Sequence, residues 1–230
     1  MKAALAALFL LGAAPAFAGD VTATRILSGD TLQLSDGRVL RLEGVKAVGP
    51  RAQEYLQASV GHELVLQDAV TDRYGRVAAL VAVAGQQDTL QDALVRQGLA
   101  FVYPALGGEA RLDAMLAEES AARARKAGYW ADHSDTPAAE AGNLIGRYGF
   151  VSGKILQAAR VKNKVYLNFG ADWRSDFTIA IAAHDLRAFK KAGIDPLALA
   201  GKNVRVRGWV KRDFGPMVTI TDPHQIEIME

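Results

Sequence analysis

The chain contains no cysteine. A disulfide framework, a thiolate metal site and a cysteine nucleophile are therefore excluded. Histidine is also scarce, and the four residues are scattered without the spacing of metal ligands: His62, His133, His184 and His224. The sequence has no Walker loop, nucleophile elbow or zinc motif. None of the familiar patterns for ATP hydrolysis, serine hydrolysis or zinc binding is therefore present.

Long apolar runs are few as well. The run Ala3–Leu11 is shorter than the about 20 apolar residues that span a membrane, and Pro15 follows it. Lys2 precedes this run, and the small-residue pattern Ala16-Phe17-Ala18 follows it, as is typical of a secretory signal. We therefore predict a signal peptide over residues 1–18, cleaved after Ala18, instead of a retained membrane helix. The mature protein is expected to be periplasmic or secreted, with no membrane association beyond export.

The first half of the mature chain has the pattern of short strands followed by helices. Alternating or β-branched runs are separated by turn signals such as Asp36-Gly37. The predicted strands are Val21–Ser28, Thr31–Ser35, Arg38–Val45, Glu63–Gln67 and Arg76–Ala84. Helical spacing follows near residues 52–60, after a cap at Asp88, and over 110–126. This order favours a small five-stranded barrel of the OB type over residues 19–130.

Residues 131–143 are small, polar and aperiodic, which predicts a linker between two domains. The strand signals then resume over residues 144–230, at Gly149–Arg160, Val165–Phe169, Phe177–Ala182, Val204–Val210, Met217–Thr221 and Ile226–Met229. We expect a mostly β fold with some α structure (α+β), made of two tandem OB-fold-like five-stranded barrels. No residue-level repeat supports this pairing.

Charge differs between the two halves. Residues 19–142 carry 12 Lys and Arg against 17 Asp and Glu, whereas residues 143–230 carry 14 against 8. A second domain with a net charge of +6 suits binding to a polyanion by counterion release. A soluble basic surface, or a surface that docks on the acidic first domain, explains the same asymmetry equally well.

Several ordered motifs of the first domain resemble the staphylococcal nuclease (thermonuclease) family. They are Gly29-Asp30-Thr31, Arg41-Leu42-x-Gly44-Val45, Asp72-Arg73-Tyr74-Gly75-Arg76, Ala93–Ala100, Val102-Tyr103-Pro104 and the closing Trp130. The resemblance runs from about Val21 to Trp130 and implies an OB barrel with flanking helices. It also implies a phosphodiester site, in which two arginines and a calcium ion stabilise the phosphoryl charge and a glutamate activates water.

The resemblance assigns roles to five positions of this sequence. Asp30 matches the first calcium ligand, and Arg41 and Arg76 match the two arginines that stabilise the phosphoryl group. Tyr74 and Tyr103 fall in regions that line the nucleotide pocket.

The departures from the family pattern lie in one loop. Where the family has a second calcium carboxylate, a proline and the catalytic glutamate, this chain has Lys46, Val48 and Gly49. A single carboxylate is a poor match for calcium, which takes six to eight oxygen ligands. Glu43 shares a strand face with Arg41, but a solvated pair on the barrel exterior is the simpler interpretation. Calcium-dependent hydrolysis is therefore expected to be lost, and calcium to be a cofactor only if the family site works.

Lys46, Arg41 and Arg76 are left as a metal-free cationic pocket, which predicts binding of nucleic acid or nucleotide phosphates. Two other functions stay open: an active phosphodiesterase with an altered metal or base arrangement, and a non-catalytic structural or protein-interaction module. In the last, Arg41 and Arg76 pair with Asp30 and Glu43. If only the loop positions were lost, Lys46→Asp with Gly49→Glu should create calcium-dependent cleavage.

The second domain carries nine of the seventeen aromatic residues. Most are expected to fill the barrel, but Trp173 and Arg174 lie in a polar stretch and are predicted to contact nucleic acid. Arg205 and Arg207 alternate with Val204 and Val206, so both arginines share a face that we expect to point outward. These four residues, Trp173, Arg174, Arg205 and Arg207, form the predicted second contact surface.

Overall fold

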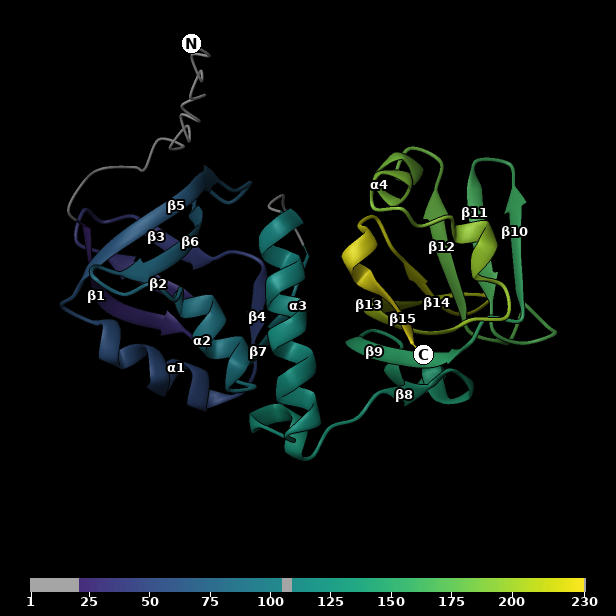
Figure 1. Cartoon of the computed structure of the whole chain (residues 1–230), viewed down its shortest axis with the longest axis horizontal. Coiled ribbons are helices and arrows are strands. Elements are labelled where there is room, and N and C mark those ends of the chain that lie inside the picture. Colours follow the sequence, from purple (N-terminus) through teal and green to yellow (C-terminus); the bar gives the residue numbers. More distant parts are fainter. Residues whose placement is uncertain (1–20, 105–108, 230) are drawn as a thin grey trace, which may run out of the picture. The chain divides into compact units, whose positions relative to one another are not determined.

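The computed structural model describes residues 21–104 and 109–229, and the chain divides into two compact units after Ala131 (Figure 1). The signal peptide predicted over residues 1–18 lies outside the described residues. No helix in the described part of the chain combines the length and apolarity that crossing a membrane requires. The two units are described separately below.

The first unit is built on a closed barrel with the strand order β1-β2-β3-β6-β5 (Figure 1). Neighbouring strands are antiparallel except for β3 and β6, which are parallel. The strands are β1 (Val21–Ser28), β2 (Thr31–Leu34), β3 (Val39–Leu42), β5 (Glu63–Thr71) and β6 (Val77–Val83). This closed barrel confirms the predicted OB-like fold of the first domain.

The barrel core follows the alternation of the sequence. In β2 and β3 every second residue is buried, which places Leu32, Leu34, Leu40 and Leu42 inside the barrel. Because side chains alternate along a strand, Arg41 between Leu40 and Leu42 points to the opposite face. The hydrophobic alternation that closes the core therefore also presents Arg41 on the outer face of the barrel.

Three helices and a two-stranded ribbon flank the barrel. These elements are β4 (Val45–Ala47), α1 (Pro50–Leu56), α2 (Leu90–Arg96), β7 (Ala100–Val102) and α3 (Glu109–Ala124), with short 3₁₀ turns η1 (Gln57–Ser59) and η2 (Gly128–Ala131). Strand β4 pairs with β7, and α3 packs beside this ribbon (Figure 1).

Two details differ from the sequence prediction. The strand predicted over Arg38–Val45 is divided at Gly44, so that β4 leaves the barrel and pairs with β7 instead. The cap of α2 is Thr89 and not Asp88, because the Thr89 hydroxyl and the Asp92 carboxylate form a reciprocal capping box.

The second unit contains one eight-stranded sheet with the order β10-β11-β12-β14-β13-β9-β8, and β15 also pairs with β13. Its strands are β8 (Thr136–Pro137), β9 (Tyr148–Lys154), β10 (Gln157–Val161), β11 (Lys164–Asn168), β12 (Thr178–Ala182), β13 (Asn203–Asp213), β14 (Gly215–Thr219) and β15 (Ile226–Met229). Helix α4 (Leu186–Lys191) and the turns η4 (Pro196–Leu199) and η5 (Pro223–Gln225) complete this unit.

The strand order of the second sheet repeats that of the first barrel. Strands β9 and β10 are consecutive halves of one bent strand, and together they flank β13 on one side and β11 on the other. At the bend, the Ile155 N–H donates to Lys202 and the Leu156 N–H donates to Asn168, each at 2.8–2.9 Å. Strands β12 and β14 form the parallel pair, as β3 and β6 do in the first unit.

The segment predicted to be a linker, residues 131–143, is largely part of the second unit. Strand β8 pairs with β9, and the turn η3 (Ala138–Leu144) buries Ala141 against the core. Asp135 makes an ion pair with Arg205, with 2.6 Å between Oδ2 and Nε. The linker prediction is therefore wrong over residues 132–143, because a short polar segment can pair with a strand edge without carrying a strand pattern of its own.

Candidate functional site

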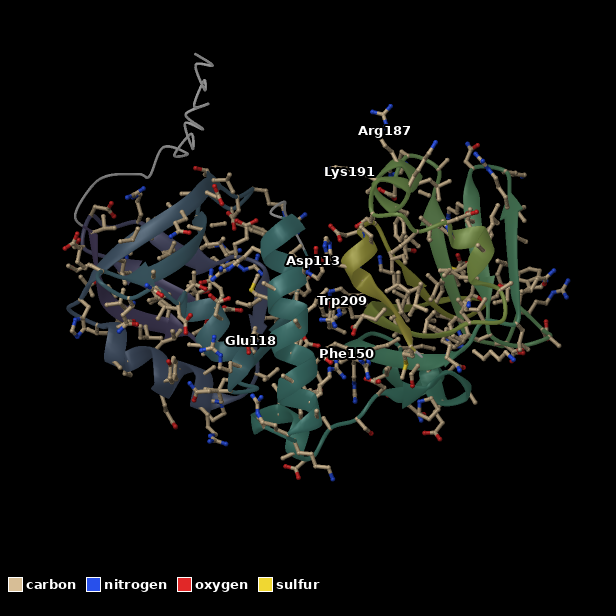
Figure 2. All side chains as sticks on the ribbon, in the orientation of Figure 1. Asp113, Glu118, Phe150, Arg187, Lys191 and Trp209 are labelled. Atoms are coloured by element: carbon tan, nitrogen blue, oxygen red, sulfur yellow. The ribbon has the colours of Figure 1, made fainter. Side chains whose placement is uncertain are left out.

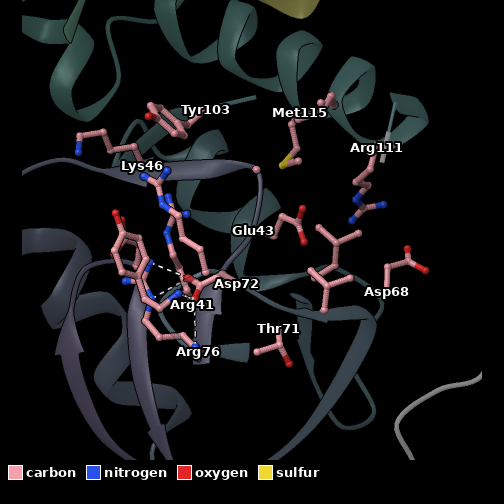
Figure 3. A pocket seen from close by; sticks show the side chains of 17 residues that line it. Arg41, Glu43, Lys46, Asp68, Thr71, Asp72, Arg76, Tyr103, Arg111 and Met115 are labelled. Carbon is pink, nitrogen blue, oxygen red and sulfur yellow. Dashed lines mark hydrogen bonds and ion pairs between the residues drawn. The ribbon is translucent and has the colours of Figure 1, made fainter. Parts of the chain in front are cut away.

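A cavity of the first unit has a volume of about 1110 Å³ and is lined by residues from the barrel, the β4–β7 ribbon and α3 (Figure 3). All six residues that the sequence nominated in this domain line it: Asp30, Arg41, Lys46, Tyr74, Arg76 and Tyr103. The cavity therefore brings together side chains that are up to 73 positions apart in the chain.

Arg41 and Lys46 converge on one aromatic ring. The guanidinium carbon of Arg41 lies 5.9 Å from the centre of the Tyr103 ring, and the Lys46 ammonium lies 6.0 Å from it (Figure 3). Tyr103 is held in place because its N–H donates to the Gly44 carbonyl at 2.8 Å. Lys46 is thus a second cation beside Arg41, at the position where the family pattern has a carboxylate.

Arg76 is anchored by a carboxylate from the same turn. Its Nε and Nη2 both lie 2.8 Å from Oδ2 of Asp72, while Oδ1 of Asp72 accepts the N–H groups of Tyr74 and Arg76. Burial acts to raise the pKa of Asp72, but the hydrogen bonds from Arg76 and Tyr74 outweigh it and lower the pKa below its usual value. Arg76 also lies 5.2 Å from the Tyr74 ring. Its ion-pair partner is therefore Asp72, not Asp30 or Glu43.

Among the residues that the structure describes, Asp30 makes no ion pair with an arginine. Its Oδ1 accepts hydrogen bonds from the hydroxyls of Ser28 and Thr31, each at 2.9 Å. Within the described residues, no three Asp, Glu, His or Cys side chains come together as a metal site. The donor set does not fit calcium, because Asp72 is engaged by Arg76 and the position of the second carboxylate holds Lys46.

Glu43 also lines the cavity, which the sequence interpretation missed. Its N–H donates to Ala79, and the buried Gln91 side chain donates to the carbonyls of Ala79 and Glu43 at 2.8 and 3.4 Å. The pKa of the Glu43 carboxyl is raised to about 7, chiefly by burial and also by the charge of Asp68, while Arg41 acts in the opposite direction. Spacing by two residues from Arg41 was the available signal, but it does not reveal that α2 and α3 cover this face.

Figure 3 shows that the cavity has two ends. Arg41, Lys46, Arg76 and Tyr103 gather at one end, and Glu43, Asp68, Arg111 and Met115 at the other. Arg111 is itself ion-paired with Asp92 of the α2 capping box. The cationic end suits an anion, and the other end presents one half-buried carboxyl with a raised pKa.

The backbone of the loop that departs from the family pattern continues the β4–β7 pairing and then takes a glycine-specific conformation at Gly49. Val48 donates its N–H to Leu99 at 2.9 Å, which continues the pairing of β4 with β7. Gly49 then has φ 69° and ψ 177° and precedes Pro50, the first residue of α1. This combination is adopted almost exclusively by glycine. The position matched to the catalytic glutamate is therefore shaped for a residue without a side chain.

Of the four residues predicted to form the contact surface of the second unit, two are exposed and two are engaged in ion pairs. Trp173 is 48% exposed and Arg174 lies 4.8 Å from its ring, as expected for a surface pair. Arg207, however, is 1% exposed and pairs with Glu227, and Arg205 pairs with both Asp135 and Glu227. The outward orientation predicted for Arg205 and Arg207 is wrong, because the segment before β8 and strand β15 cover that face of β13 and supply its carboxylates.

The closed barrel gives the first unit an OB-type fold, with a cavity that is cationic at one end. The family model described as staphylococcal nuclease homologue matches residues 28–132, which confirms the resemblance seen in the sequence for this unit. A search of the curated proteins finds no match. A domain of this family supports a nucleic-acid-binding or nuclease-type function.

Proposed function

We propose that the first unit binds the phosphate groups of nucleic acid or nucleotides without calcium. The observation that carries this proposal is the placement of Arg41 and Lys46 within 5.9 and 6.0 Å of the Tyr103 ring centre, in a cavity that Arg76 also lines. Guanidinium groups can grip phosphate oxygens with two parallel hydrogen bonds, and lysine adds a compact point charge. Lys46 supplies the positive charge that a cation supplies in a calcium site.

The aromatic residues support a nucleotide over a bare phosphate. Tyr74 is 66% exposed and lines the same cavity as Tyr103. A tyrosine ring offers a flat apolar surface for a sugar or base, while the arginines beside it hold the phosphate. The cavity volume of about 1110 Å³ is sufficient for a nucleotide.

Titration of the full chain with a nucleoside 3′,5′-bisphosphate tests this function. We expect calorimetric binding of equal strength in calcium and in EDTA, and a loss of about tenfold or more in Arg41→Ala and in Lys46→Ala. Arg38→Ala is the matched control, because Arg38 is an exposed arginine that pairs with Asp36 and does not line the cavity. Absence of binding in both conditions would sink the proposal, as would full affinity in the Lys46 variant.

Glu43 favours a second candidate, phosphodiester hydrolysis without calcium. In this reaction a water oxygen attacks phosphorus, Glu43 takes the water proton, and the leaving sugar oxygen takes a proton from solvent as its bond to phosphorus breaks. A carboxyl with a pKa of about 7 is half ionised at neutral pH, which suits a general base. Arg41, two residues before Glu43 and lining the same cavity, stabilises the charge of the transition state.

An assay of single- and double-stranded DNA and RNA, in EDTA and across divalent metals, separates the two candidates. Cleavage in EDTA that disappears in Glu43→Gln supports hydrolysis. Binding without cleavage under any condition rejects hydrolysis and leaves the binding function. If salt has no effect on association with any polyanion, a structural or protein-interaction role replaces both.

We further propose that the protein acts after export, in the periplasm or outside the cell. The support is the pattern from Lys2 to Ala18, which is typical of a cleaved secretory signal. Mass spectrometry of the protein from its producing cell is expected to find an N-terminus at Gly19. An intact Met1 on the exported or cellular protein would reject cleavage at this site.

A further inference from the structure

Two large aromatic side chains lie together on the surface of the second unit. Trp173, in the β11–β12 loop, is 48% exposed, and Phe214, at the tip of the β13–β14 hairpin, is 67% exposed. Their ring centres are 5.2 Å apart with an angle of 76° between the planes. We call this pair the Trp173–Phe214 platform. Neighbouring exposed aromatic rings are unfavourable in water and commonly mark a binding surface.

The backbone at Phe214 makes the pair harder to explain as ordinary turn structure. Phe214 has φ 59°, in the left-handed region where glycine and asparagine are favoured. A hairpin tip with this φ is most stable with a small or polar residue, so an exposed phenylalanine there costs stability twice. The position is therefore explained better by what the ring contacts than by the turn that it forms.

Both rings are held in place by the protein itself. A side chain at Gly215 would meet the Asp176 carbonyl at 2.6 Å, so the hairpin tip packs backbone to backbone against the β11–β12 loop. Within that loop the Asp172 N–H donates to the Asp176 carboxylate at 2.9 Å, and the Arg174 N–H donates to Asp172 at 3.1 Å. A surface fixed before binding loses little conformational entropy when a ligand arrives.

The platform adjoins a pocket with cationic and apolar walls. The pocket has a volume of about 460 Å³, and Phe214 lines it together with the apolar residues Phe169, Phe177 and Pro216. Arg174 and Arg212 line it as well, and neither makes an ion pair with any residue that the structure describes. The one carboxylate of the lining, Asp176, already accepts the Asp172 N–H. Charge and shape therefore suit a planar ring that carries an anionic group.

We propose that the Trp173–Phe214 platform stacks a base of single-stranded nucleic acid, while Arg174 and Arg212 contact its phosphate. This inference rests on the proposed function only in the class of ligand, because the platform and the Arg41–Lys46 cavity belong to different units. It replaces the Arg205–Arg207 surface, whose charges are taken up by Asp135 and Glu227.

The test measures the binding of two probes of equal charge to the full-length protein. Fluorescence anisotropy is measured with a labelled single-stranded oligothymidylate and with an abasic deoxyribose-phosphate chain of the same length. Stacking predicts tighter binding of the base-containing probe by about fivefold or more. Equal affinity for the two probes overturns the proposal, because phosphate attraction alone then accounts for binding. Displacement by an acidic aromatic peptide in preference to the oligonucleotide overturns it too.

Variants locate the effect. Trp173→Ala and Phe214→Gly are expected to abolish the difference between the probes, and Phe214→Gly suits the left-handed backbone, so it retains the fold. Trp209→Ala is the matched control, and Trp209 is labelled in Figure 2. Trp209 is 47% exposed on β13 beside Tyr148 and does not line the platform pocket, so its variant is expected to keep the difference. An unchanged difference in Phe214→Gly with a normal melting temperature contradicts the proposal.

Repeating the comparison in Arg41→Ala with Lys46→Ala separates the two sites. If the platform binds a base, the preference for the base-containing probe persists in this background even though nucleoside bisphosphate binding is lost. If the preference is lost with the cavity, the platform proposal fails and the proposed function stands. If the bisphosphate never binds but the preference is present in the unaltered chain, the reverse holds.

Discussion

Glu43 and Arg41 are two residues apart and line one cavity, but their surroundings differ. Arg41 lies beside the Tyr103 ring, whereas burial disfavours the charged form of Glu43. The buried Gln91 donates hydrogen bonds to the carbonyls of Glu43 and Ala79, which fixes the backbone that carries the carboxyl. The carboxyl is therefore a structural cost at high pH and a candidate base at neutral pH.

The first prediction concerns this residue. The pKa of Glu43 rises from 4.5 in the unfolded chain to about 7 in the fold, so the folded state binds a proton more tightly. The free energy of unfolding should therefore fall by roughly 1–3 kcal/mol, after allowance for solvent screening, as pH rises from about 4.5 to about 7. Above that pH it should level off. Urea unfolding of the natural chain and of Glu43→Gln checks it. A stability difference between the two that does not change with pH contradicts it.

The segment from β4 to the start of α1 carries the departures of the first unit from the family pattern that it resembles. Strand β4 carries Lys46 into the cavity because it pairs with β7 and not with the barrel. Gly49 then turns the chain into α1 with a conformation in which a side chain is strained. This element therefore differs from the family pattern in its side chains, and its backbone at Gly49 disfavours the glutamate that the pattern has there.

The second prediction is at this scale and reverses the expectation drawn from the sequence. Lys46→Asp with Gly49→Glu is not expected to create calcium-dependent cleavage, because Glu at φ 69° is strained by about 1–3 kcal/mol and the strain opposes this backbone at the position of the catalytic base. Lys46→Asp alone serves as the control and should be close to the natural chain in stability. Unfolding free energies and a calcium-dependent nuclease assay measure both effects. Cleavage by the double variant at unchanged stability would falsify this account of the loop.

At the scale of the whole molecule, each unit has its own core and the same strand order. The two hydrophobic cores share no residue, and each is enclosed by the strands of one unit. Residues 132–143 belong to the second unit, so the three acidic residues of this segment are counted with that unit. Residues 132–230 carry 14 Lys and Arg against 11 Asp and Glu, a net charge of +3 instead of +6. Polyanion binding by this unit therefore depends on local groups such as Arg174 and Arg212.

The third prediction concerns the boundary between the units. A fragment of residues 132–230 should fold and unfold cooperatively, whereas a fragment of residues 144–230 should be less stable by about 2–4 kcal/mol. The shorter fragment loses the β8–β9 pairing, the buried Ala141 and the Asp135 partner of Arg205. Urea unfolding followed by circular dichroism measures the difference. Equal stability of the two fragments would restore the interpretation of residues 131–143 as a linker.

The local pattern of the sequence was sufficient for the order of strands and helices and for the barrel. It also predicted the meeting of Arg41, Lys46, Arg76, Tyr74 and Tyr103 in one cavity. These features follow from alternation along each strand and from motifs that the family shares, and both are local properties of the chain.

Only the tertiary structure decided what covers the other face of each strand. That covering places Glu43 within the cavity and buries Arg207 beside Glu227. It also joins residues 132–143 to the second unit and sets Phe214 against Trp173. Alternation gives the side of a strand on which a residue lies, but burial, charge pairing and pKa depend on segments that are distant in sequence and reach that side only in the folded chain.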